Sequence, residues 1–325
     1  MEIALKLRPC PDRTWVIARQ MGITVAVTAI PLGEYIPMFR HEKPWKFEPL
    51  LRLKSAFRDA GMDLSVLEGN LPLDKTKLGL PGRDAEIQLF CELLRNMGKV
   101  GIPILSYAFM AKFGWLRTST TTVTRGGALT TSFDYNLVKD APLTEAGEVS
   151  EEEMWDNFAY FLHNVVPCAE KAGVKLALHP DDPPVARLRG LARIFRSVDA
   201  FKRAIQLEPS EYSGINFCQG NFSAMGCDIQ NTIHDFGHTG KIFYAHFRDI
   251  RGNAQKFCET FHDDGQTNMF MAMKAYKEAG FRGPIRPDHA PTMEGEENVN
   301  PGYETLGRLF AVGYMKGLME ALKVS

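Results

Sequence analysis

Short apolar runs recur along the chain, separated by longer segments in which apolar residues follow a helical period. Runs that are apolar almost throughout are typical of parallel strands that are covered on both faces. Pro9 follows the first run and Gly69 ends the third, as expected where a strand stops. The predicted strands are residues 3–8, 23–28, 63–69, 102–109, 174–179, 214–218, 242–247 and 283–289.

Amphipathic segments lie between most of these strands. In one of them, Leu50, Leu53 and Phe57 repeat at helical spacing. Strand–helix alternation of this kind predicts a (β/α)8 TIM barrel, with residues 1–325 as a single domain. The alternative is a doubly wound open sheet, but such a sheet would need a glycine-rich phosphate loop early in the chain, where no GxGxxG motif occurs. The predicted helices are 48–62, 84–101, 151–173, 268–280 and 304–324.

One connection is too long for a simple turn. Residues 110–150 follow the fourth predicted strand and are rich in Thr and Gly. Long connections inside compact domains are usually functional or disordered. At this place in a barrel the segment would cover the catalytic face as a lid, with Arg117 at its base as a contact for a substrate carboxylate or hydroxyl. The alternative is a disordered insertion without a role.

Composition narrows the class of protein. The 325 residues are 45% hydrophobic and 24% charged, and the net charge is −1, so nothing points to a nucleic-acid or membrane surface. The first residues contain no apolar run of signal-peptide length, which makes a cytoplasmic protein the default expectation. The six cysteines form no CxxC pair, so we expect free thiols rather than a disulfide framework.

Four residues of metal-binding types stand at the ends of the last four predicted strands. Successive members are separated by about one strand–helix unit, so neighbouring strands would bring them to a common point at the catalytic face. Two imidazoles, a thiolate and a carboxylate suit Mn, Fe, Co, Ni or Zn. Taken singly, each residue is more often structural, and only the joint pattern favours a metal site. The predicted ligands are His179, Cys218, His246 and Asp288.

Other polar residues follow the same strand ends. Asp181 and Asp182 lie between prolines, where either could accept a hydrogen bond from a ligand histidine or contact a substrate hydroxyl. Arg248 and Arg251 could bind a carboxylate, and His262 is a further candidate for the site. For the two aspartates the alternative is a solvated turn, for the two arginines it is surface salt bridging, and for His262 it is a structural role.

Two residues near the last predicted strand could transfer protons. His289 directly follows Asp288 and could act as an acid or base near neutral pH. Tyr303 lies where the last helix begins, and a neighbouring cation could lower the pKa of its hydroxyl. Without such a cation, a tyrosine at this position is usually part of the core.

Several motifs resemble the mannonate dehydratase family, which is placed among the xylose-isomerase-like barrels. The resemblance implies a metal, typically manganese, held by the four predicted ligands, with His289 and Tyr303 at the reacting centre. Tyr107, within one of the shared motifs, is expected among the substrate contacts. The motifs are AIPLGE (29–34), YAFM (107–110), WLRT (115–118), LHPDDPP (178–184), FCQG (217–220), HFRDIRG (246–252), IRPDH (285–289) and PGYETLGRLFAVGYMKGL (301–318).

The chain departs from the family pattern in segments that face the substrate. The histidine expected after the third strand is missing, Ala108 stands for an asparagine and Gly114 for an aspartate. The resemblance implies a lyase that dehydrates a sugar acid such as D-mannonate to a 2-keto-3-deoxy acid. We also expect the enzyme to be a homo-oligomer. A sugar isomerase or epimerase is the enzymatic alternative, and an inactive sugar-acid-binding protein is the non-enzymatic one.

Overall fold

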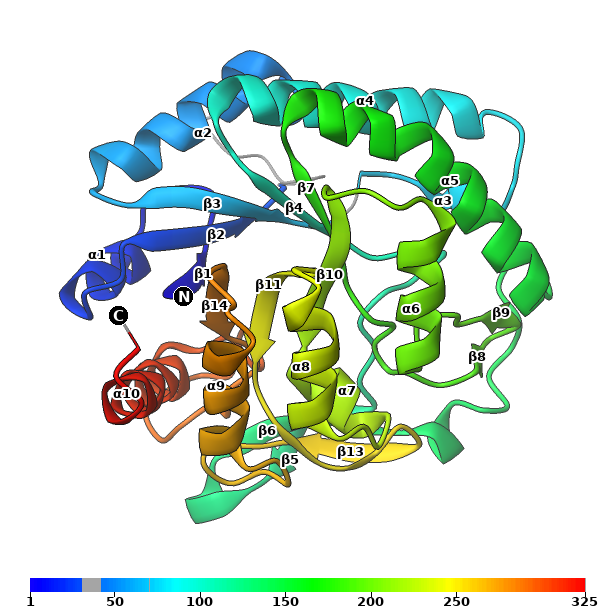
Figure 1. Cartoon of the computed structure of the whole chain (residues 1–325). Coiled ribbons are helices and arrows are strands. Elements are labelled where there is room, and N and C mark those ends of the chain that lie inside the picture. The colour runs from blue at the N-terminus through cyan, green and yellow to red at the C-terminus, as the bar shows by residue number, and fades with distance from the viewer. Residues whose placement is uncertain (31–41, 70, 325) are drawn as a thin grey trace.

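Eight parallel strands close into a barrel in the computed structural model, which describes residues 1–30, 42–69 and 71–324 (Figure 1). Each strand pairs with the next along the barrel, and β1 pairs with β14 to close it. All eight coincide with predicted strands, so the TIM-barrel prediction is confirmed. The strands are β1 (Glu2–Leu7), β2 (Val25–Ala29), β3 (Asp63–Glu68), β4 (Ile104–Tyr107), β7 (Lys175–Leu178), β10 (Ser213–Cys218), β11 (Ile242–Phe247) and β14 (Pro284–Pro287).

Helices surround the barrel, as Figure 1 shows. The five predicted helices are confirmed as α2 (Phe47–Asp59), α4 (Arg83–Val100), α5 (Glu151–Ala172), α9 (Met269–Glu278) and α10 (Thr305–Ala321). Helix α5 begins with a capping box in which Ser150 and Glu153 exchange hydrogen bonds with each other's backbone. Five shorter helices of the described residues were not predicted: α1 (Arg13–Gln20), α3 (Asp74–Lys77), α6 (Val198–Leu207), α7 (Gln219–Ala224) and α8 (Ile229–His238).

Alternate residues of each barrel strand face the interior, and their chemistry changes along the barrel. Val66 and Ala177, near the middle of their strands, belong to a small apolar cluster inside the barrel. Two residues further on, Glu68 and His179 face the same way at the carboxyl ends, because side chains alternate across a strand. The carboxyl-terminal end of the barrel is therefore polar, as expected for the catalytic face of this fold.

The segment 110–150, which we expected to be a long loop, instead carries two strands, β5 (Ser119–Val123) and β6 (Leu129–Asp134). They join β12 (Ile250–Asn253) and β13 (Lys256–Glu259), which follow barrel strand β11, in an antiparallel sheet of order β12-β13-β6-β5. Threonine is β-branched and favours strands, so its abundance here indicated pairing rather than a loop. A short two-stranded sheet, β8 (Arg187–Leu188) with β9 (Leu191–Ala192), lies after β7.

Helices α4 and α5 are joined by a disulfide between Cys91 and Cys168, whose Cα atoms lie 5.6 Å apart. This corrects the expectation that all cysteines are thiols: the two helices pack side by side and bring together residues that are far apart in sequence. The described part of the chain contains no helix long and apolar enough to cross a bilayer.

Gly98 marks the closest approach of these two helices. A Cβ atom at this position would collide with the backbone carbonyl oxygen of Ala172 at the end of α5. We therefore expect Gly98→Ala to lower the free energy of unfolding by about 1–3 kcal/mol, the usual cost of overpacking. Chemical denaturation measures the change.

The matched control for this prediction is Gly313→Ala in α10. An added Cβ there has no heavy atom within 4 Å, so the better helix propensity of alanine should stabilise the protein by up to about 1 kcal/mol. If both variants unfold at the same denaturant concentration as the wild type, the packing argument is wrong.

Candidate active site

A cavity of about 570 Å³ opens at the carboxyl-terminal ends of the barrel strands. This volume lies in the range of small-molecule sites. Barrel strands and the segments that follow them supply its walls, and Trp115 and Thr120 come from the connection after β4. Six predicted site residues line the cavity: Tyr107, His179, His246, Asp288, His289 and Tyr303.

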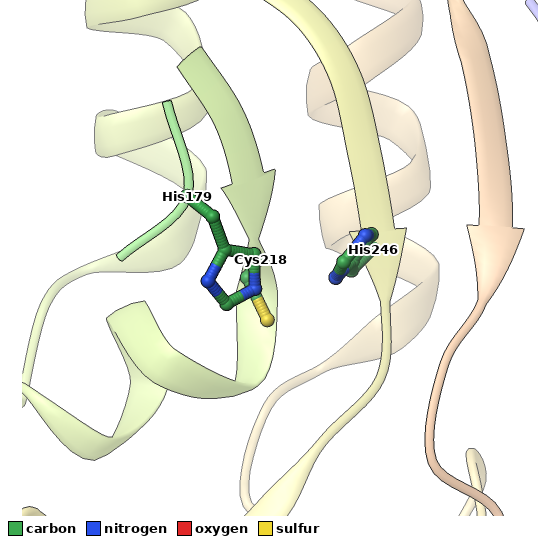
Figure 2. Close-up of side chains that lie close together, drawn as sticks. All are labelled: His179, Cys218 and His246. Atoms are coloured by element: carbon green, nitrogen blue, oxygen red, sulfur yellow. The ribbon is translucent and has the colours of Figure 1, made fainter. Parts of the chain in front are cut away.

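Three of the four predicted metal ligands form a compact cluster. The ligand atoms of His179, Cys218 and His246 all lie within 4.8 Å of one another. Figure 2 shows the three side chains at the ends of neighbouring strands. Asp288 lies beside them, with Oδ2 at 4.0 Å from Cys218 Sγ and 3.4 Å from His246 Nδ1.

Hydrogen bonds orient the two histidines of this cluster. His179 Nδ1 lies 2.7 Å from the carbonyl oxygen of Pro180, so this nitrogen carries the proton and Nε2 is left as the lone-pair donor. His246 Nε2 lies 2.9 Å from Glu68 Oε1, while its buried Nδ1 has no hydrogen-bond partner. Burial lowers the pKa of His179, which favours the neutral form that binds metals. Two oriented imidazole nitrogens and a cysteine sulfur fit a divalent transition-metal ion.

A buried charge network supports His246 from inside the barrel. Glu68 accepts hydrogen bonds from Tyr244 Oη at 2.7 Å and Arg286 Nε at 2.9 Å, and its Oε2 lies 2.9 Å from Lys6 Nζ. Burial alone would raise the pKa of Glu68, but the charges of Arg286 and Lys6 outweigh it and hold this pKa well below its usual range. Glu68 therefore stays ionised and helps to hold the ring of His246, whose Nε2 also lies 2.9 Å from Asn216 Nδ2.

A second buried network joins the antiparallel sheet to the site. Arg117 forms ion pairs with Asp182 and Glu259, and its side chain is fully buried. Arg248 makes the same two pairs, at 3.1 Å to Asp182 and 2.7 Å to Glu259. Glu259 also lies 3.0 Å from His289 Nδ1. Although burial opposes ionisation, the two arginines lower the pKa of Glu259 to about 2.

Four residues predicted to contact substrate therefore lie away from the cavity surface. Arg117 and Arg248 are occupied by protein carboxylates. Asp181 accepts a hydrogen bond from the backbone N–H of Phe195, and it is the neighbouring Asp182 that lines the cavity. His262 is buried outside the cavity lining among the described residues, and burial lowers its pKa to about 4.

Tyr303 contacts Asp288, the carboxylate beside the ligand cluster. Its hydroxyl donates a hydrogen bond of 2.8 Å to Asp288 Oδ1, and its ring packs edge-on against His289. We had expected a nearby cation to lower the pKa of Tyr303. Instead, burial and the Asp288 carboxylate raise it to about 12, because they outweigh the positive charges of Lys6 and Arg286. The hydroxyl therefore keeps its proton in this environment.

Sequence reasoning missed three charged residues of the site: Lys6, Glu68 and Arg286. The signal for the first two was the alternation of the strands, since each stands two residues after an interior apolar residue, Ala4 or Val66. The AIPLGE motif (29–34) lies largely outside the described residues.

Comparison with known proteins agrees with the motifs. The family model for D-mannonate dehydratase (UxuA) matches residues 16–146 and 142–325. Mannonate dehydratase of Thermotoga maritima is 33% identical over 339 aligned positions, which cover 93% of this chain and 90% of that protein.

Solved structures give the same picture. The crystal structure of mannonate dehydratase from Streptococcus suis serotype 2 has a TM-score of 0.86 at 29% identity, covering 99% of this chain and 95% of that one. A xylose isomerase domain protein from Planctomyces limnophilus, at 13% identity, has a TM-score of 0.61 over 99% and 98% of the two chains, and it supports the xylose-isomerase-like barrel alone. By the match of the family model over nearly all of its length, this chain belongs to the D-mannonate dehydratase family.

Proposed function

We propose that this protein dehydrates a sugar acid, D-mannonate or a related aldonate, to a 2-keto-3-deoxy acid. The observation that carries the proposal is the cluster of His179, Cys218 and His246 within 4.8 Å, whose two histidines line the same cavity as His289 and Tyr303. Family membership supports the same reaction, since the relatives are named mannonate dehydratases. A volume of about 570 Å³ is ample for a six-carbon acid.

The ligand cluster would hold one divalent cation, with Asp288 as the nearest carboxylate. We propose manganese, while the donor set also suits Fe, Co, Ni or Zn. The bound cation would polarise the substrate carboxylate and so make the neighbouring C–H bond more acidic.

Two residues are placed to move the protons of the elimination. Glu259 accepts the Nδ1–H of His289, which leaves Nε2 of this ring free to take the proton from C2 of the substrate. Tyr303 keeps its own proton and can donate it to the hydroxyl that leaves C3 as water. The resulting enol then becomes the 2-keto-3-deoxy acid. In the structure the Tyr303 proton is donated to Asp288 Oδ1 over 2.8 Å, and the hydroxyl would turn from that carboxylate to the leaving group in the reaction.

A mass-resolved activity screen tests the reaction class. Manganese-loaded protein is incubated with hexonates, pentonates and free sugars, and the products are weighed by mass spectrometry. We expect at least one hexonate to lose one water, and the free sugars to remain unchanged. A product of unchanged mass would instead indicate an isomerase or epimerase, and binding without turnover would indicate an inactive binding protein.

The metal assignment predicts the effect of removing one ligand. Cys218→Ser and His246→Ala should each lose bound manganese on dialysis. Their affinity for the metal should fall by more than the roughly 10- to 100-fold that is usual when a hydrogen-bond partner of a ligand is removed. Elemental analysis measures the metal content. Cys227→Ser, which changes a half-buried free thiol outside the cavity lining, is the control and should stay loaded. Full occupancy in the two ligand variants would refute the assignment.

The role of Tyr303 predicts a loss of turnover without a loss of fold. Tyr303→Phe keeps the ring and removes only the hydroxyl, so turnover should fall roughly 100-fold or more, while metal content is unchanged. Tyr276→Phe is the control, because Tyr276 is a fully buried tyrosine outside the cavity lining whose hydroxyl has no hydrogen-bond partner. Equal turnover in both variants would make Tyr303 a packing residue.

A further inference from the structure

Lys6 brings a positive charge into the cavity from the end of β1. It stands two residues after Ala4, which belongs to the apolar cluster inside the barrel, so its side chain points into the barrel mouth. The side chain lines the cavity and is 30% exposed.

Lysine and arginine are scarce on the cavity wall. Among the described residues that line it, only Lys6 and Arg286 belong to these types. The side chain of Arg286 is 1% exposed, and its guanidinium is taken up by Glu68, Tyr244 and Asp288. Arg286 can therefore offer little to a substrate.

Lys6 is engaged less completely. Its ammonium carries three N–H donors, and one carboxylate oxygen, Glu68 Oε2, lies 2.9 Å away. Glu68 does not depend on this contact, since it also accepts hydrogen bonds from Tyr244 and Arg286. Partial burial opposes the charged form of Lys6, but the Glu68 carboxylate outweighs it and raises the pKa, so the ammonium stays charged.

The ammonium of Lys6 lies close to the groups proposed to react. Glu68 binds Lys6 through Oε2 and contacts His246 of the ligand cluster through Oε1. Lys6 Nζ also lies 5.1 Å from the centre of the Tyr303 ring. The charge is thus one side chain away from both the ligand cluster and the proposed proton donor. In an aldonate, the carboxylate is attached to C2, the carbon that loses its proton.

We propose that Lys6 binds the carboxylate of the substrate and thereby makes the cavity selective for sugar acids over neutral sugars. The inference rests on the proposed function, because it assumes an aldonate in this cavity. A carboxylate that leaves water needs charged donors in return, and a charge-assisted hydrogen bond is stronger than one between neutral groups. Lys6 supplies such a donor on the cavity wall, beside the Glu68 carboxylate and within 5.1 Å of the Tyr303 ring.

Binding of D-mannonate to manganese-loaded protein tests the inference. Isothermal titration calorimetry gives the dissociation constant, and elemental analysis gives the metal content of each variant. Lys6→Met should raise the dissociation constant roughly 10- to 100-fold, the usual scale for a hydrogen bond to a charged group, and should leave the metal content unchanged. Lys6→Arg, which keeps the charge, should stay within about threefold of the wild type on the same scale.

Lys54→Met is the matched control, because Lys54 is also a partly buried lysine paired to a carboxylate, Asp63 at 2.7 Å, but lies outside the cavity lining. It should bind mannonate like the wild type. An unchanged dissociation constant in Lys6→Met would overturn the inference. A parallel loss of metal would also overturn it, because Lys6 would then act only by supporting Glu68 and His246.

A different outcome would contradict the proposed function. Wild-type protein that binds mannonate without eliminating water would contradict the dehydratase, while the comparison of Lys6 variants would still decide what binds the carboxylate.

Discussion

The mouth of this barrel keeps many ionised side chains away from water, and it can do so only because each faces an opposite charge. A single carboxylate or guanidinium buried without a partner would cost several kcal/mol. Glu68 meets Arg286 and Lys6, while Asp182 and Glu259 share Arg117 and Arg248. The pairs hold side chains from different strands in fixed positions, so the geometry of the ligand histidines and of His289 depends on them.

This dependence explains how the antiparallel sheet takes part in the site. Glu259 comes from β13, outside the barrel, yet it reaches His289 and sets which ring nitrogen carries the proton. Arg117 comes from the start of the segment that forms β5 and β6, and it contacts the same carboxylate. The sheet is therefore joined to the reacting groups by buried charges.

Much of this arrangement could be predicted from the sequence, and the remainder could not for physical reasons. Strand ends follow from local patterns. The barrel could therefore be predicted, as could the clustering of His179, Cys218 and His246 at one end of it. Ion pairs between distant segments leave no local pattern, so Arg117 was expected at the substrate rather than between two protein carboxylates. The Cys91–Cys168 disulfide was missed for the same reason, since it depends on how two helices pack.

The contact between Arg117 and Glu259 spans 142 residues and links the connection after β4 to the one after β11. Connections on TIM barrels usually diversify one at a time, which is how a single scaffold comes to serve many reactions. Here, a replacement segment that lacks Arg117 or Glu259 would remove one charge from a buried network in which Asp182 and Arg248 remain, and the loss of a buried ionic partner is destabilising. A change in one segment therefore has consequences for the other: a replacement of either must supply a side chain of the same charge at this contact.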